Sequence, residues 1–165
     1  MSSLLAFEDA LQEIKRSATV RVAQQTIALP HALGSILSED IIAHIAVPPH
    51  DNSAMDGYAL AYADWQEGKH FTISQRIAAG RHPQPLVPGT CARIFTGANI
   101  PPGADTVIMQ ENGHLIDGKL VLDAPPIQGD NIRPAGQDMH VGQTVIAAGE
   151  KITPIHIGPL SSLGI

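Results

Sequence analysis

The chain has 165 residues, a formal net charge of −6 and a hydrophobic fraction of 44%, which suits a soluble globular protein of one domain or two small ones. The acidic balance argues against nucleic-acid binding, and no apolar run approaches the roughly 20 residues that span a bilayer, so neither nucleic acid nor a membrane is an expected partner. One cysteine excludes a disulfide framework, and without a recognisable signal peptide the expected location is the cytoplasm.

The N-terminal part of the chain predicts two helices and one strand. An amphipathic helix is expected over residues 4–18, because its apolar residues recur at three-and-four spacing: Leu4, Phe7, Leu11 and Ile14. A strand is expected over residues 25–29, followed by a short helix over residues 30–37 whose inward positions are Leu33, Ile36 and Leu37. Residues 40–45 fit either a helix or a strand.

Most glycines and prolines follow residue 47, which predicts short strands joined by turns. The expected strands cover residues 58–62, 71–78, 91–95, 106–110, 131–133 and 144–147, with a surface loop over residues 80–89. Asp117-Gly118 lies between two apolar segments and predicts a two-residue hairpin within residues 114–122. Thr153 should cap a last helix that has Pro154 at its first position and Gly164 at its end. Cys91 lies in an apolar run and is expected in the core.

Residues 47–60 form the most unusual stretch, because four side chains with oxygen atoms fall within six positions: Asp51, Asn52, Ser53 and Asp56. Such a cluster suits a hard cation or its water shell. The same residue types also cap helices and form tight turns. A calcium loop is excluded, since Met55 and Asp56 stand where that loop needs an oxygen ligand and a glycine. The residue types alone leave a cation site and a turn both open.

The nine residues 51–59, Asp-Asn-Ser-Ala-Met-Asp-Gly-Tyr-Ala after a Val-Pro step, resemble the signature of the molybdenum-insertion enzymes of molybdenum cofactor synthesis, MoeA and the E domains of gephyrin and its plant relatives. Two further blocks are similar to that family, residues 93–111 and residues 131–138. In the last block Gln137 stands where many relatives carry glutamate, and some relatives have arginines in place of Pro134 and Ala135.

The resemblance implies a molybdopterin molybdenumtransferase, which inserts molybdate into adenylylated molybdopterin, uses Mg²⁺ and releases AMP. It also implies a homodimer, and it adds the molybdopterin adenylyltransferase as a further partner. The chain is interpreted as an N-terminal fragment that lacks the pterin-binding domain and is inactive alone. Because the chain is acidic, we expect the missing domain to bind most of the phosphate and molybdate charge. The alternative is a non-catalytic scaffold of the gephyrin type, and a second rival is a plain β-rich domain.

By position in the family blocks, the resemblance implies a catalytic set that lines one side of a cleft and faces the other subunit of the dimer: Asp56, Thr96 and Asp138. Residues expected to bind substrate are Asn52, Ser53 and Arg133. Asp56 and Asp138 are the expected ligands of Mg²⁺ or of its waters, since this ion needs only one or two carboxylates. Each position also has an ordinary interpretation: Thr96 as a strand end, Asp138 as a turn residue and Arg133 as a solvated charge.

The expected fold is mixed α+β, mainly β, with two lobes and an N-terminal helix. Residues 1–19 form the helix, residues 20–46 and 141–165 form an elongated discontinuous lobe, and residues 47–140 form a β-rich domain inserted into that lobe.

Overall fold

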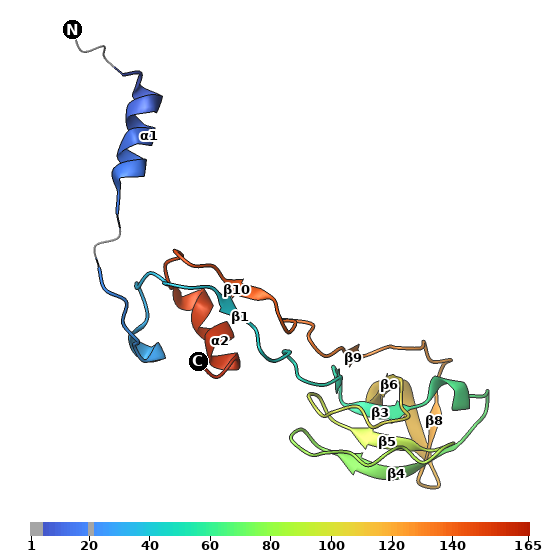
Figure 1. Cartoon of the computed structure of the whole chain (residues 1–165). Coiled ribbons are helices and arrows are strands. Elements are labelled where there is room, and N and C mark those ends of the chain that lie inside the picture. Colours follow the sequence, from blue (N-terminus) through green and yellow to red (C-terminus); the bar gives the residue numbers. More distant parts are fainter. Residues whose placement is uncertain (1–4, 20–21) are drawn as a thin grey trace.

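The computed structural model describes residues 5–19 and 22–165. Figure 1 shows an elongated chain in which a helix, a small lobe and a β-rich domain follow one another. The fold is mainly β with two α-helices, so the predicted fold class is confirmed. The residue limits of the three predicted domains stay a prediction. None of the described helices has the length and apolar character needed to cross a bilayer.

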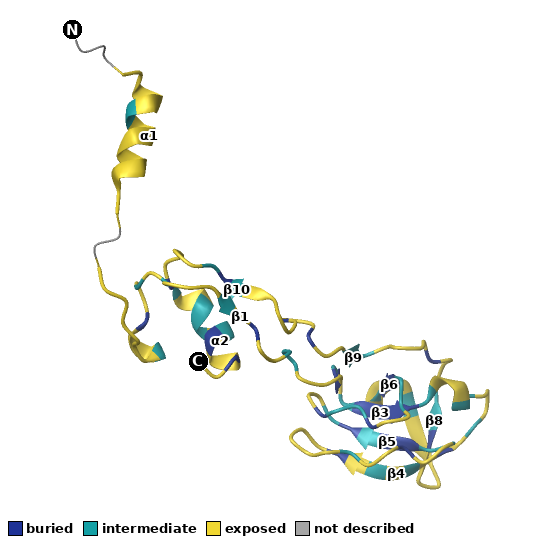
Figure 2. Cartoon of the chain, viewed as in Figure 1, coloured by how far each residue is buried: buried dark blue, intermediate teal, exposed yellow. Residues whose placement is uncertain are grey.

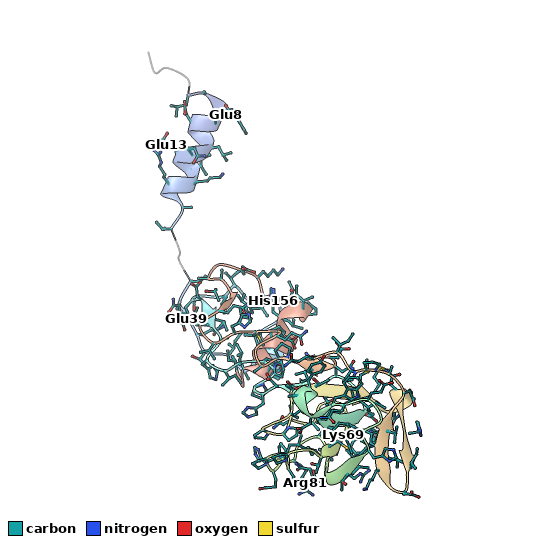
Figure 3. All side chains as sticks on the ribbon, turned by 90° about the vertical axis from the view of Figure 1, so that its right-hand side faces the viewer. Glu8, Glu13, Glu39, Lys69, Arg81 and His156 are labelled. Carbon is teal, nitrogen blue, oxygen red and sulfur yellow. The ribbon has the colours of Figure 1, made fainter. Side chains whose placement is uncertain are left out.

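Helix α1, Phe7–Ser17, is shorter than the predicted helix, whose first residue lies outside the described part of the chain. Its first turn carries two acidic residues and its last turn two basic ones, as the dipole favours. None of its described residues is buried (Figure 2), and Figure 3 shows the side chains of Glu8 and Glu13 apart from the other two parts. The apolar stripe of α1 is therefore exposed: Phe7, Leu11 and Ile14.

The small lobe pairs two short strands and packs a helix against them. Strand β1, Ile41–Ile42, runs antiparallel to β10, Thr144–Ile146. Helix α2, Pro154–Ser162, follows the predicted capping residue Thr153, whose backbone N–H donates to His156 Nδ1 at 3.2 Å. Apolar residues from both ends of the chain form its core: Ala32, Ile146, Ile152 and Leu160.

Two predictions for the small lobe are wrong. Residues 25–28 form no strand, and residues 30–37 form no helix beyond the single 3₁₀ turn Leu29–His31. The chain turns at Gly34, which has a φ of +83°, and its backbone then bonds to residues 150–152 instead of to itself. Two of the three positions expected to face inward are consequently exposed, Leu33 by 52% and Ile36 by 62%.

The β-rich domain contains a six-stranded sheet of order β6-β3-β5-β4-β8-β7, in which only β4 and β5 are parallel. The strands are β3 Gly57–Leu60, β4 Phe71–Ile77, β5 Cys91–Ile94, β6 Thr106–Met109, β7 Gly113–Ile116 and β8 Lys119–Leu122. Short 3₁₀ turns follow β3 and β6, at Tyr62–Asp64 and Gln110–Asn112. The predicted hairpin is confirmed, since Asp117 and Gly118 both have positive φ, at 49° and 74°.

Both faces of the central strands are buried. One face carries a cluster that includes Ala59, Ile77, Ala92, Ile94 and Val107, and the other a cluster that includes Leu60, Phe71, Cys91 and Leu120. Cys91 is fully buried, as predicted, and burial raises the pKa of its thiol to about 12. Two short strands, β2 Asn52–Ser53 and β9 Ile132–Arg133, pair beside this sheet on the segments that lead to the small lobe.

Asp105 ties the loop after β3 to the segment before β9. Its carboxylate accepts hydrogen bonds from Tyr62 N–H at 2.6 Å, from the Gln128 side-chain amide at 2.8 Å and from the Thr106 hydroxyl at 3.1 Å. Burial acts to raise the pKa of this carboxyl, but these donors outweigh it and hold the pKa below its usual range. The carboxylate therefore stabilises the fold above its unfolded pKa, and the contribution is lost as the pH falls through the lower folded pKa.

We expect the Asp105→Asn variant to lose less stability than the wild type on acidification, because it has no carboxylate to protonate. Urea unfolding at a series of pH values from 7 to 3 measures this difference. Glu13→Gln, which removes a carboxyl on the exposed helix α1, should follow the wild-type curve. Parallel curves for Asp105→Asn and the wild type would contradict the assigned role.

Candidate functional site

Three segments far apart in the sequence meet at strand β2. On one side β2 pairs with β9, so Asn52 lies opposite Arg133. On the other side it bonds to the segment after β5: Gly97 N–H donates to Ser53 O at 2.8 Å, and Ser53 N–H donates to Ala98 O at 2.9 Å. The three sequence blocks that resemble one family therefore adjoin in space.

Asp56 and Thr96 contact each other directly. One carboxylate oxygen of Asp56, Oδ1, accepts both the Thr96 backbone N–H at 2.8 Å and the Thr96 hydroxyl at 2.7 Å. These bonds, first from the backbone and then from the hydroxyl, lower the pKa of Asp56, and the positive charge of Arg93 adds to them. Asp56 is thus a carboxylate at neutral pH. Its second oxygen accepts no hydrogen bond from the described residues.

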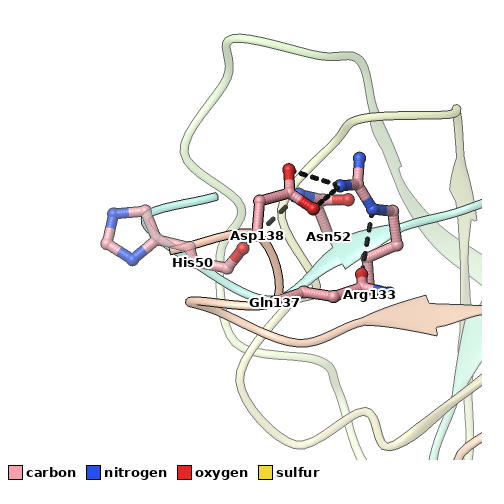
Figure 4. A network of polar contacts seen from close by, with 5 residues as sticks. All are labelled: His50, Asn52, Arg133, Gln137 and Asp138. Atoms are coloured by element: carbon pink, nitrogen blue, oxygen red, sulfur yellow. Dashed lines mark hydrogen bonds and ion pairs between the residues drawn. The ribbon is translucent and has the colours of Figure 1, made fainter. Parts of the chain in front are cut away.

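Arg133 and Asp138, two of the predicted site residues, form an ion pair (Figure 4). The Nη2 atom of Arg133 lies 3.0 Å and 3.2 Å from the two carboxylate oxygens of Asp138, and its Nε donates to Gln137 Oε1 at 3.1 Å. Gln137, a departure from the family pattern, thus still binds the guanidinium. Both charged side chains are about half exposed, so we expect the pair to contribute at most about 1 kcal/mol to stability.

The two other predicted substrate-binding residues are buried. Ser53 is 1% exposed, and its hydroxyl donates to Met55 O at 2.6 Å, which forms a local turn. Asn52 is 8% exposed, and its side-chain amide makes one long bond of 3.5 Å to His50 O (Figure 4). The other polar atom of this side chain, Oδ1, is buried and has no partner among the residues described. That oxygen is an acceptor available to a water molecule or a ligand donor.

The oxygen-rich stretch therefore does not form one cage. Asp51 accepts Ala135 N–H at 2.8 Å, Ser53 bonds within its own turn, and Asp56 bonds to Thr96. In residues 5–19 and 22–165 no three histidine, cysteine or acidic side chains gather as metal ligands. Mg²⁺ needs only one or two carboxylates, and Asp56 fits because one of its oxygens is free. Asp138 fits less well, because Arg133 already neutralises it.

A groove of about 540 Å³ borders this region, and its lining includes His50, Asp51, Asn99 and Ala135. None of the six predicted site residues lines it. Two residues that the sequence did not single out as site residues bond to the backbone here: Gln110 N–H donates to Asp56 O, and Arg93 donates to the carbonyl oxygen of the next residue, Gly57. The sequence feature that points to Arg93 is its position as a charged residue within an otherwise apolar strand.

Comparisons with known proteins agree on one family. The family described as MoeA N-terminal region (domain I and II) matches residues 5–164. A molybdopterin molybdenumtransferase of Haemophilus influenzae is 37% identical over 164 residues, which cover 98% of this chain and 41% of that protein. Molybdopterin molybdenumtransferase 2 of Mycobacterium tuberculosis is 35% identical over 148 residues, covering 85% of this chain and 36% of that protein.

Solved structures give the same result. A crystal structure of the molybdopterin biosynthesis MoeA protein from Pyrococcus horikoshii superposes with a TM-score of 0.84 at 30% identity, over 99% of this chain and 43% of that one. A second structure of the protein from this organism gives a TM-score of 0.79 at 32% identity, over 86% and 39%. The chain spans about two fifths of the length of these relatives.

Proposed function

The chain belongs to the family of the MoeA N-terminal region, and on that premise we propose that it forms one side of a site where molybdate is inserted into adenylylated molybdopterin with release of AMP. The relatives it matches carry the name molybdopterin molybdenumtransferase. The observation that supports this role best is the contact between Asp56 and Thr96, two residues 40 positions apart that the family pattern singles out and the fold joins at 2.7 Å.

In this proposal Asp56 is the residue that binds the metal ion. Thr96 occupies one carboxylate oxygen and thereby directs the other toward the ligand. Mg²⁺, bound through this oxygen and its own waters, would supply positive charge beside the phosphate oxygens of the substrate. Asn52 has a buried carbonyl oxygen that no described residue satisfies and that would accept a hydrogen bond from the ligand or from a bound water, and Ser53 supports the turn that carries Asp56.

Arg133 and Asp138 act as a unit in the proposed site. With the guanidinium paired to the carboxylate, neither side chain has a full net charge to offer a dianionic substrate. We therefore propose that Asp138 orients Arg133, and that most of the anion binding comes from the part of the relatives that this chain does not cover. A homodimer, a cytoplasmic location and delivery of the substrate by the molybdopterin adenylyltransferase belong to the same proposal.

The test is a chimera that carries this chain in place of the matching part of the Haemophilus influenzae relative. With adenylylated molybdopterin, molybdate and Mg²⁺, we expect the chimera to release AMP and the isolated chain to release none. A chimera that is folded by circular dichroism but releases no AMP would contradict the proposal and favour the scaffold alternative. AMP release by the isolated chain would contradict the division of the site between this chain and the rest of the enzyme.

A further inference from the structure

The backbone at Asp56 is held from two directions by hydrogen bonds. Gln110 N–H donates to Asp56 O at 3.0 Å, and Arg93 Nη1 donates to Gly57 O at 2.8 Å. The two donors are also joined to each other, because Arg93 Nη2 donates to the side-chain oxygen of Gln110 at 2.6 Å. Arg93 and Gln110 thus hold the two successive carbonyls of Asp56 and Gly57 and are bonded to each other, and we call this pair the clamp.

The guanidinium of Arg93 is itself held in place. Arg93 lies on β5 opposite Tyr58 on β3, and its central carbon lies 5.2 Å from the Tyr58 ring centre and 4.6 Å from that of Phe95. A guanidinium is planar and donates in fixed directions, so one side chain bonds to a carbonyl and to an amide oxygen at once. The cation–π contacts with the two rings favour this position of the guanidinium.

Asp56 needs such support because its side chain is not fixed by burial. Its carboxylate depends for its position on the two bonds from Thr96, which follows β5. Those bonds require the β3 backbone and the end of β5 to keep their relative positions. The clamp joins these two segments through Arg93 on β5 and Gly57 on β3, directly beside the carboxylate.

We infer that Arg93 and Gln110 are positioning residues, which set the backbone at Asp56 so that its carboxylate meets Thr96 and presents its free oxygen to the ligand. This inference rests on the proposed function, which gives Asp56 its role. The geometry that it describes can be measured without an activity assay. A misplacement of about 1 Å in a reacting group is sufficient to lower a rate by up to about 100-fold.

Arg76 offers a matched control. It lies opposite Arg93 on the neighbouring strand β4, and its guanidinium carbon is also 4.6 Å from the Phe95 ring centre. It therefore has the same charge and shares one of the two aromatic partners of Arg93. Among the described residues, only Arg93 of these two arginines donates to Gly57 and Gln110.

The first experiment measures amide hydrogen exchange by NMR in the 165-residue chain. In Arg93→Gln we expect the Thr96 and Gln110 amides to exchange at least 10-fold faster, while amides in the β7–β8 hairpin keep their wild-type rates. Arg93→Lys retains the charge without the fork, and should show the same loosening at Gln110. Arg76→Gln should leave both amides unchanged. Wild-type exchange at Thr96 and Gln110 in both Arg93 variants would overturn the inference.

The second experiment measures AMP release by the chimera. Arg93→Gln is expected to lower kcat about 10-fold with little change in KM, whereas Arg76→Gln should retain the wild-type kcat. Loosened amides with a wild-type kcat would support the clamp but contradict the proposed role of Asp56. Unchanged exchange rates of the Thr96 and Gln110 amides would overturn the clamp at any level of activity. Failure of the clamp and failure of the proposed function are therefore distinguishable.

Discussion

Asp56→Asn is expected to lower the kcat of the chimera for AMP release by about 100-fold or more, while the fold persists. Asparagine keeps an oxygen that accepts the Thr96 N–H and hydroxyl, which lie at 2.8 Å and 2.7 Å from Oδ1 in the native protein. The substitution removes the negative charge, and loss of one preorganised electrostatic contact typically reduces kcat by 10²–10³-fold. Steady-state assays at saturating Mg²⁺ and molybdate, with urea unfolding beside them, measure both effects.

The control for this prediction is Asp123→Asn. Asp123 is an exposed carboxylate of the same β-rich domain, where it lies 2.7 Å from His114 at the base of the hairpin. Its loss removes the same charge at a position away from β2 and should leave kcat within about twofold of the wild type, since exposed ion pairs contribute little. Wild-type activity in Asp56→Asn would remove this carboxylate from the mechanism.

The β-rich domain was largely predictable because its signals are local. The apolar residues of a strand and the turn residues beside it lie within a few positions of one another in the sequence. The sequence therefore predicts the strand Phe71–Ile77 and the hairpin at Asp117-Gly118. The small lobe was less predictable, because residues 34–37 bond to residues 150–152, more than 100 positions away. No local pattern reports such a pairing, and the apolar residues before it suggested a regular helix and strand instead.

The site shows the same division between local and distant information. The stretch around Asp56 left a turn and a cation site open. The structure shows the turn at Ser53, and the cation site at Asp56 stays a prediction. The resemblance named Thr96 and Asp138, but the partners of each came only from the fold. Arg93 was missed because its hydrogen bonds run to a backbone carbonyl 36 positions away, and a backbone acceptor has no sequence signature.

Gly57→Ala is expected to destabilise the protein by about 3 kcal/mol or more, at the upper end of the range for overpacking. Gly57 begins β3, which lies between β5 and β6. A Cβ atom there would lie 1.9 Å from Ile108 O and 2.9 Å from Ile108 C. These are backbone atoms of the neighbouring strand, so no side-chain rotation relieves the contact and β3 must separate from β6.

Gly158→Ala is the matched control for this substitution. Gly158 lies within α2, and apart from its chain neighbours nothing lies within 4 Å of the added atom. The gain in helix propensity is opposed by crowding between the new Cβ and the ring of Pro159, so alanine should change the stability by less than about 1 kcal/mol. Urea unfolding of both variants gives the comparison. Because Gly57 is bonded to Arg93 and follows Asp56, we expect Gly57→Ala also to expose the Thr96 amide to exchange. A Gly57→Ala variant as stable as the wild type would show that β3 and β6 do not approach as closely as this contact requires.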